Sequence, residues 1–79
     1  LLVRGAGPGF CGGYDLVEFA ERKGAGGGNQ EMPWDPTLDF AGMWRNTQDF
    51  MSLWRCRKPT VACVHGSAVA GGSDIALCC

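Results

Sequence analysis

Hydrophobic and polar positions follow one another along the chain in segments whose spacing predicts short strands and helices. Residues 1–4, of which the first three are apolar, predict a short buried strand, and the glycine-rich stretch 5–9 after them predicts a turn. Asp15 precedes the mainly apolar positions 16–20, so we expect Asp15 to cap a short helix that Gly24 ends. The first quarter of the chain therefore predicts strand, glycine turn and helix.

A longer helical pattern follows a loop rich in glycine and proline at residues 24–36. From Thr37 the spacing predicts a helix of about 18 residues that Pro59 ends. Trp34 lies on the preceding loop, where it is a candidate lid or subunit contact. The apolar face of the helix, with both of its tryptophans in the core, is predicted to comprise Phe40, Met43, Trp44, Thr47, Phe50, Met51 and Trp54.

The last segment repeats the first pattern. Residues 60–64 form a β-branched run that predicts a strand buried on both faces, and the small residues 66–72 predict a second turn. Residues 73–79 predict the opening of a buried helix. This order is typical of an α/β protein with parallel strands, in which ligand sites lie at the carboxyl ends of the strands, where both glycine turns occur.

Charge and composition exclude several classes of function. The chain has seven Lys and Arg residues and eight Asp and Glu residues. The resulting net charge of -1 predicts no basic surface for binding nucleic acid or an anionic membrane. No apolar stretch approaches the roughly 20 residues of a membrane-spanning helix. The five cysteines are odd in number and lack the spacing of a zinc site, so we expect no metal and a reducing, cytoplasmic location.

The chain has the features of a part of a domain. Its 79 residues begin in an apolar run without Met and end in another apolar run without a helix stop signal. A chain of this length buries only about 60% of the surface that it exposes when unfolded. We therefore expect residues 1–79 to be a partial domain that is truncated at both ends.

Two motifs in the turns resemble those of a known family. Residues 10–16, Phe-Cys-Gly-Gly-Tyr-Asp-Leu, resemble the F-x-x-G-x-D-[LI] segment of the crotonase (enoyl-CoA hydratase/isomerase) superfamily. Residues 58–74 resemble its K-P-x-I-A-x-[VI]-x-G-x-[AC]-x-G-G-G-x-[ED] segment. The resemblance covers essentially the whole chain, and it implies an N-terminal core fragment of the crotonase-like (ββα) fold within the α/β class.

The resemblance implies an enzyme of acyl-CoA esters, most simply an enoyl-CoA hydratase or isomerase of fatty acid metabolism. The backbone N–H groups of Tyr14 and Gly71 would form an oxyanion hole for the thioester oxygen, and Asp74 would be the catalytic acid or base. Asp74 could instead accept N–H bonds in the first turn of its helix, and Asp15 is expected to cap a helix rather than touch substrate. The substrate-binding residues implied are Gly12, Gly13, Tyr14, Asp15, Leu16, Ala70 and Gly71.

The same resemblance implies the remaining components of the reaction. Coenzyme A would enter as part of the substrate, with no permanently bound cofactor, and the full-length protein would form a homotrimer or hexamer. A second catalytic acid would come from a segment after Cys79. Residues 1–79 alone are therefore expected to show no turnover.

Other hypotheses remain open. Residues 7–12 satisfy the dinucleotide-binding pattern G-x-G-x-x-G, although residues 24–36 lack the second strand that this fold requires. The chain could also belong to a non-catalytic module that binds coenzyme A or a partner. His65 is interpreted as a residue that stabilises a turn, and Ser73 lacks the closing glycine of a G-x-S-x-G nucleophile motif.

Overall fold

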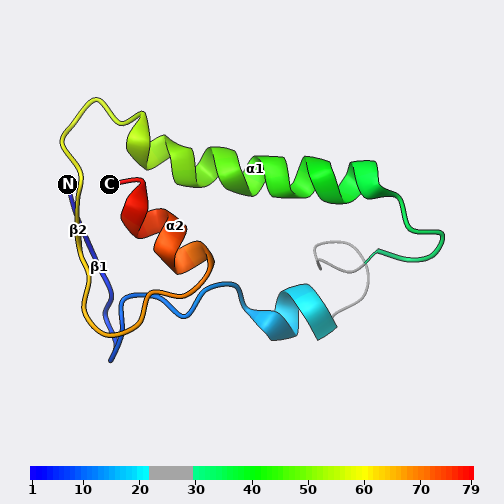
Figure 1. Ribbon diagram of the computed structural model, residues 1–79, viewed down its shortest axis with the longest axis horizontal. Helices are drawn as coiled ribbons and strands as arrows, with labels where there is room; N and C mark the ends of the chain where they lie inside the picture. Colours follow the sequence, from blue (N-terminus) through cyan, green and yellow to red (C-terminus); the bar gives the residue numbers. More distant parts are fainter. Residues whose placement is uncertain (22–29) are drawn as a thin grey trace. The chain divides into compact units, whose positions relative to one another are not determined.

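The computed structural model describes residues 1–21 and 30–79. Two strands and three helical segments follow one another along the chain (Figure 1). The chain divides into two compact units. The first comprises residues 1–14 and 47–79, and the second comprises residues 15–46. The predicted order of strands and helices is confirmed, and it is compatible with an α/β fold. The elements are β1 (Leu2–Arg4), η1 (Val17–Glu21), α1 (Pro36–Trp54), β2 (Val61–Cys63) and α2 (Gly71–Leu77).

The first unit contains a two-stranded parallel sheet, as the sequence predicted. Leu2 pairs with Val61, and the register continues to the pair of Arg4 and Cys63. The two strands lie side by side in Figure 1. Each strand has three residues. Because the strands are parallel, the turns that follow them leave the sheet at the same end.

The expected burial of both strands is wrong for this chain. Leu2 is 66% exposed and Val61 is 59% exposed, whereas Phe10, in the turn after β1, is 7% exposed. Within the described residues Phe10 is the only buried large hydrophobic side chain. A parallel sheet is buried only when other elements cover both faces, and the elements described here leave much of this sheet uncovered.

Helix α1 begins one residue before the predicted start because Pro36 suits the first helical position, where its missing N–H costs nothing. Asp35 caps this end: its Oδ1 accepts hydrogen bonds from the Thr37 backbone N–H at 2.9 Å and the Thr37 hydroxyl at 2.6 Å. The helix ends at Trp54, well before Pro59, in a tight turn in which the Cys56 N–H donates to the Leu53 carbonyl at 3.1 Å. The predicted length of about 18 residues from Thr37 is confirmed, and only the assignment of the stop to Pro59 is wrong.

The predicted apolar face of α1 is largely accessible. Trp44 is 56% exposed and Trp54 is 67% exposed, so the expectation that both belong to a core is wrong here. Phe40 and Trp44 stack with ring centroids 6.2 Å apart, which reduces the water contact of each ring. Phe50 and Met51, near the end of α1, are half-buried. No helix in the described parts is long and apolar enough to cross a membrane.

In the second unit, Asp15 caps a helical turn as predicted. Its Oδ1 accepts the N–H groups of Val17 at 2.9 Å and Glu18 at 3.2 Å. The expected short helix is a π-helix, η1. The predicted stop at Gly24 lies outside the described residues.

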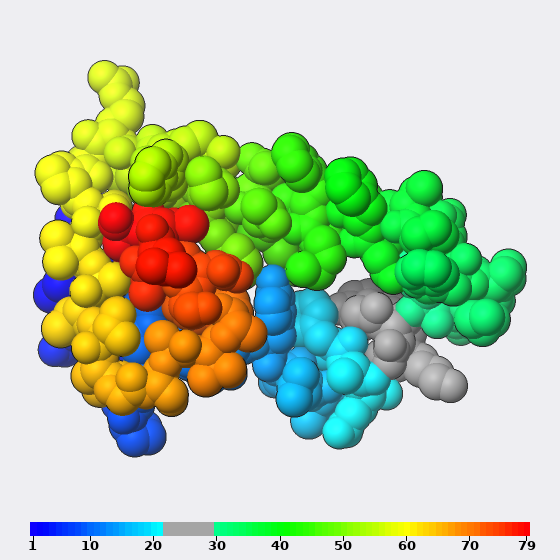
Figure 2. Space-filling view, in the orientation of Figure 1, coloured from blue at the N-terminus to red at the C-terminus, as the bar shows by residue number. Residues whose placement is uncertain are grey.

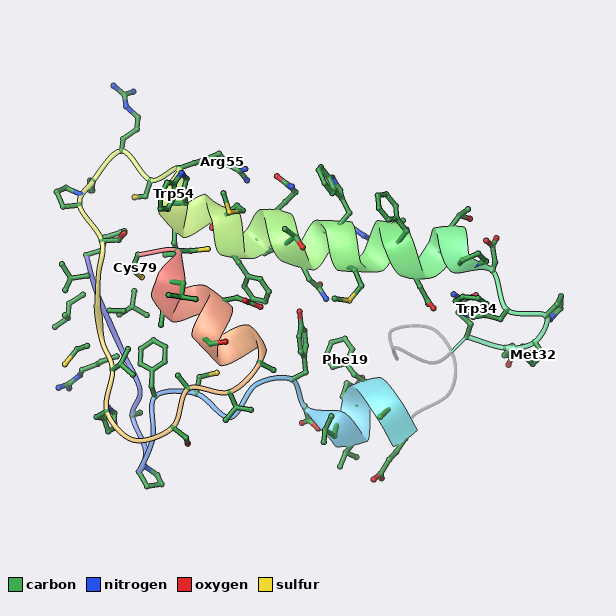
Figure 3. The ribbon with its side chains drawn as sticks, in the orientation of Figure 1. Phe19, Met32, Trp34, Trp54, Arg55 and Cys79 are labelled. Carbon is green, nitrogen blue, oxygen red and sulfur yellow. The ribbon has the colours of Figure 1, made fainter. Side chains whose placement is uncertain are left out.

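A second hydrogen-bonded group joins the loop before α1 to the first turn of that helix. The Asp39 carboxylate accepts the Trp34 indole N–H at 2.6 Å and the Gln30 side-chain amide at 2.5 Å. Figure 3 shows Trp34 on this loop. These donors lower the pKa of Asp39, with Gln30 the larger cause and Trp34 the second. The sequence identified Trp34 but not its partner, because the contact depends on how the loop folds back.

Candidate functional site

The two glycine turns run side by side. Cys11 forms an isolated parallel bridge with Ala68. The Val69 N–H donates to the Cys11 carbonyl at 3.0 Å, and the N–H groups of Phe10 and Cys11 donate to the Ser67 carbonyl at 3.0 and 3.1 Å. The pairing of β1 with β2 therefore continues into the turns that carry the candidate residues.

The close approach of the turns depends on two glycines. Gly13 has a φ of 90°, and a Cβ atom there would lie 2.8 Å from the Val69 carbonyl oxygen. Gly72 is buried, and a Cβ atom there would lie 2.6 Å from the Cys11 Cβ. Real Cβ atoms do not come this close to other atoms, so larger residues at either position would separate the turns.

Tyr14 and Gly71, the two expected oxyanion donors, are neighbours. A Cβ atom on Gly71 would lie 3.2 Å from the Tyr14 Cε2 and 3.2 Å from the Phe50 Cζ. The rings of Tyr14 and Phe50 meet edge to face with centroids 6.3 Å apart. Gly71 is buried and Tyr14 is half-buried. The sequence placed Phe50 only on the apolar face of α1, and its contact with both residues appears only in the tertiary structure.

Only some of the backbone N–H groups at the start of α2 donate a hydrogen bond within the described structure. The Gly72 N–H donates to the Val69 carbonyl at 2.8 Å, and Ser73 and Asp74 donate to the Ala70 carbonyl at 2.8 and 3.3 Å. Gly71 is the first residue of α2, two residues before the predicted start of this helix. Across the described residues, no carbonyl or side chain accepts the Gly71 N–H. This N–H group therefore remains available to an acceptor.

Ala70 has an unusual backbone. Its φ of 48° and ψ of -121° are those of the first central residue of a type II′ turn, a position that normally holds glycine. The Gly72-to-Val69 hydrogen bond closes this turn. A residue with a side chain in such a conformation costs on the order of 1–3 kcal/mol, and strain of this kind concentrates at functional sites.

Asp74 lies one helical turn after Gly71, so both residues are on the same side of α2. Its side chain is exposed, and no hydrogen bond to its carboxylate is found in the part of the chain that the structure describes. The alternative expectation, that this carboxylate accepts N–H bonds in the first turn, is therefore wrong. At the same helix end the Ser73 hydroxyl donates to the Ala70 carbonyl at 2.6 Å.

The remaining candidate residues lie in both units. Gly12 is exposed in the turn after β1. Asp15 and Leu16 belong to the second unit, where Asp15 acts as the helix cap described above and Leu16 is 69% exposed. The structure thus brings together Gly13, Tyr14, Ala70, Gly71 and Asp74. The roles of all the candidate residues toward a substrate stay predictions.

A groove of about 440 Å³ opens at the carboxyl ends of the two strands. His65 lines it, and the His65 Nε2 lies 2.9 Å from the Gly7 carbonyl oxygen. This bond joins the two turns, as expected for a residue that stabilises a turn. Tyr14 and Gly71 do not line this groove, whose lining is Arg4, Gly5, Ala6, Gly7, Cys63 and His65. In the described parts, no group of three or more His, Cys, Asp and Glu residues could hold a metal ion.

Comparisons with known proteins give two relatives. The chain is 33% identical to mevalonyl-coenzyme A hydratase from Beauveria bassiana over 81 aligned positions, which cover 96% of this chain and 26% of that protein. It is 30% identical to the mitochondrial Δ(3,5)-Δ(2,4)-dienoyl-CoA isomerase of Mus musculus over 81 positions, which cover 100% of this chain and 24% of that protein. The chain thus spans about a quarter of the length of these relatives.

Both relatives are named as enzymes of coenzyme A esters, and this supports the resemblance to the crotonase superfamily. No family model matches the chain. No solved structure matches it either.

Proposed function

We propose that this chain carries the oxyanion hole of an enzyme that acts on acyl-CoA thioesters, with the backbone N–H groups of Tyr14 and Gly71 as donors. The similarity to a hydratase and an isomerase of coenzyme A esters supports the class of substrate. Coenzyme A enters this proposal only as part of the substrate.

The observation that carries the proposal is the position of Gly71. It lies against the Tyr14 ring, and its N–H is not accepted by any group in the described structure, while the next three N–H groups of α2 are paired. A thioester oxygen becomes negatively charged when the ester forms an enolate. A well-placed N–H donor stabilises this charge in the transition state by roughly 3 kcal/mol.

The absence of a side chain at Gly71 contributes in a second way. Even a Cβ atom would touch the rings of Tyr14 and Phe50, so a larger residue would move these rings or fill the space in front of the N–H. Glycine leaves the backbone accessible to a substrate atom. The strained turn at Ala70 fixes the direction of the following N–H, which supports a donor that is oriented before substrate binds.

Asp74 completes the proposal as the acid or base. Its exposed carboxylate lies one turn from Gly71 and has no other hydrogen-bonding role among the described residues. In hydration, water adds to the β carbon of the enoyl group, the carboxylate takes the water proton, and the enolate gains a proton at its α carbon. A second acid would supply that proton from outside this chain, so we infer hydration or isomerisation only for the full-length protein.

The proposal can be tested by removing the Gly71 N–H. A synthetic peptide of residues 63–79 can carry an ester in place of this amide and be ligated to residues 1–62 through Cys63. We expect the ester chain to bind acetoacetyl-CoA, whose acyl group readily forms an enolate, roughly tenfold or more weakly than the ligated amide chain. Binding of free coenzyme A should be the same for both chains.

The matched control is the same ester at Gly72, whose N–H already bonds to the Val69 carbonyl. This control should lower the stability of the turn without a specific effect on the acyl group. Equal affinity of the Gly71 ester and amide chains for acetoacetyl-CoA would contradict the proposal.

A further inference from the structure

A second groove, of about 390 Å³, gathers three of the five cysteines. It lies between the segment after α1 and the C-terminal residues, and it belongs entirely to the first unit. Figure 2 shows the C-terminal residues against the chain that follows α1. Cys56, Cys78 and Cys79 line this groove, and all three thiols are free and half-buried. The cysteines come from segments more than twenty positions apart, so the fold brings them to one surface.

The charged side chains of this thiol groove have one sign. Arg57 and Lys58 line it together with the three cysteines, and no Asp or Glu is among its lining residues. Leu53, Trp54 and Pro59 supply apolar walls. Trp54 and Cys79 are labelled in Figure 3. Two exposed cations beside accessible sulfur atoms attract a negatively charged reagent and raise its local concentration.

The three thiols differ in their contacts. The Cys78 thiol contacts the Met51 sulfur at 3.9 Å, and the Cys79 thiol donates to the Ile75 carbonyl at 3.4 Å. Within the described residues the Cys56 thiol makes no hydrogen bond, and Cys56 directly precedes Arg57. Cys56 is therefore the thiol that is free to react and nearest in sequence to the positive charges.

We propose that the thiol groove is a site of thiol–disulfide exchange with small anionic disulfides of the oxidised glutathione type. The Cys56 thiolate attacks one sulfur of the disulfide, a mixed disulfide forms, and the first glutathione leaves as a thiolate. Cys78 or Cys79, as a thiolate, then attacks the Cys56 sulfur and displaces the second glutathione. Two protein thiols are oxidised to one disulfide and the small disulfide is reduced to two thiols.

This inference is independent of the acyl-CoA proposal, because none of the groove residues belongs to the Tyr14 and Gly71 site. The described thiols form no three-ligand group that could hold a metal ion. The combination of one unengaged thiol, two further thiols and two cations fits exchange chemistry instead. Its consequence would be a covalent link between the segment after α1 and the end of α2.

The first experiment compares two disulfides of opposite charge. The reduced 79-residue chain is treated with oxidised glutathione or with cationic cystamine, and the products at each cysteine are measured by peptide mass spectrometry. Cys63, which is exposed on β2 and outside the thiol groove, is the internal reference. We expect the ratio of Cys56 to Cys63 modification to be roughly tenfold higher with oxidised glutathione than with cystamine.

The double variant Arg57→Gln with Lys58→Gln should reduce this charge preference at Cys56 several-fold and leave Cys63 unchanged. A ratio that is the same for both reagents in the unsubstituted chain would overturn the proposal. Circular dichroism of the variant, compared with that of the unsubstituted chain, establishes whether the folded structure persists.

The second experiment separates the groove from the local sequence, because Arg57 and Lys58 remain beside Cys56 in an unfolded chain. Formation of a disulfide between Cys56 and Cys78 or Cys79 depends on the fold that brings them together. We expect this disulfide to be the main product in buffer and to fall at least several-fold in 6 M urea. Cys56→Ser should abolish it. An equal yield in urea, or a main product that joins Cys78 to Cys79, would contradict the proposal.

Discussion

Gly72 lies so close to Cys11 that a Cβ atom on the glycine would be 2.6 Å from the Cβ of the cysteine and 2.9 Å from its carbonyl oxygen. The contact joins the first turn of α2 to the turn after β1, and these are the two segments that carry Tyr14 and Gly71. The geometry of the candidate site therefore depends on a position that has no catalytic chemistry of its own.

Gly72→Ala is predicted to destabilise the chain by about 2 kcal/mol, because the neighbouring atoms include backbone that has to shift. Gly42→Ala is the matched control: nothing lies within 4 Å of a Cβ at this helical position. The control should stabilise α1 by about 1 kcal/mol through its higher helix propensity. Urea unfolding followed by circular dichroism gives both values, and a Gly72→Ala chain as stable as the unsubstituted one would disprove the close contact.

Ala70→Gly is predicted to stabilise the folded chain by roughly 1 kcal/mol, since glycine adopts the φ of 48° without strain. The greater freedom of glycine in the unfolded chain offsets part of this gain. Ala76→Gly, inside α2, is the control and should destabilise the helix by about 1 kcal/mol. A loss of stability with both substitutions would show that Ala70 is not strained.

Asp74→Asn is predicted to lower kcat for enoyl-CoA hydration by roughly a hundredfold or more in the full-length protein, with little change in KM. Asparagine keeps the size of the side chain but cannot take a proton. Asp49→Asn, an exposed position on α1, should leave kcat unchanged. Full activity of the Asp74 variant would remove this residue from the proposed mechanism.

Residues 1–79 alone are predicted to show no hydration of crotonyl-CoA, because the second acid would come from elsewhere. Spectrophotometric assay of the purified chain tests this directly. Measurable turnover that disappears with Asp74→Asn would show that one carboxylate is sufficient.

The hydrogen bond from the Trp34 indole N–H to the Asp39 carboxylate is predicted to weaken only at acidic pH, where the carboxylate becomes protonated. Hydrogen bonds from Gln30 and Trp34 lower the pKa of Asp39 below its usual 3.8, although desolvation and, to a smaller extent, the nearby Asp35 carboxylate oppose this shift. The stabilisation is therefore complete above pH 3.8 and is lost as pH falls through the lower folded value. The Trp34 indole N–H resonance should stay constant from pH 7 to about 4 and move only below that range.

Asp39→Asn should shift the Trp34 resonance at neutral pH by weakening the same hydrogen bond. The indole resonance of Trp54, which has no contact with this carboxylate among the hydrogen bonds described, is the reference. A Trp34 resonance that titrates near pH 6 would point to a different partner.

The sequence by itself determined the local features. Asp15 caps a helical turn because a carboxylate at the start of a helix accepts backbone N–H groups that have no partner within the helix. The order of elements and the parallel pairing also followed from the pattern of apolar residues and glycines. The motifs at residues 10–16 and 58–74 identified the two turns before their contact was known.

Only the tertiary structure decided which side chains are covered and which distant residues meet. Periodicity predicted a buried face on α1, yet Trp44 and Trp54 are largely exposed because burial depends on what packs against a helix as well as on its own pattern. The contact of Tyr14 with Gly71 and the meeting of Cys56 with the end of α2 depend on chain folding over many residues. Local preferences fix backbone conformation at each turn, whereas the register of β1 on β2 sets the spacing between the turns.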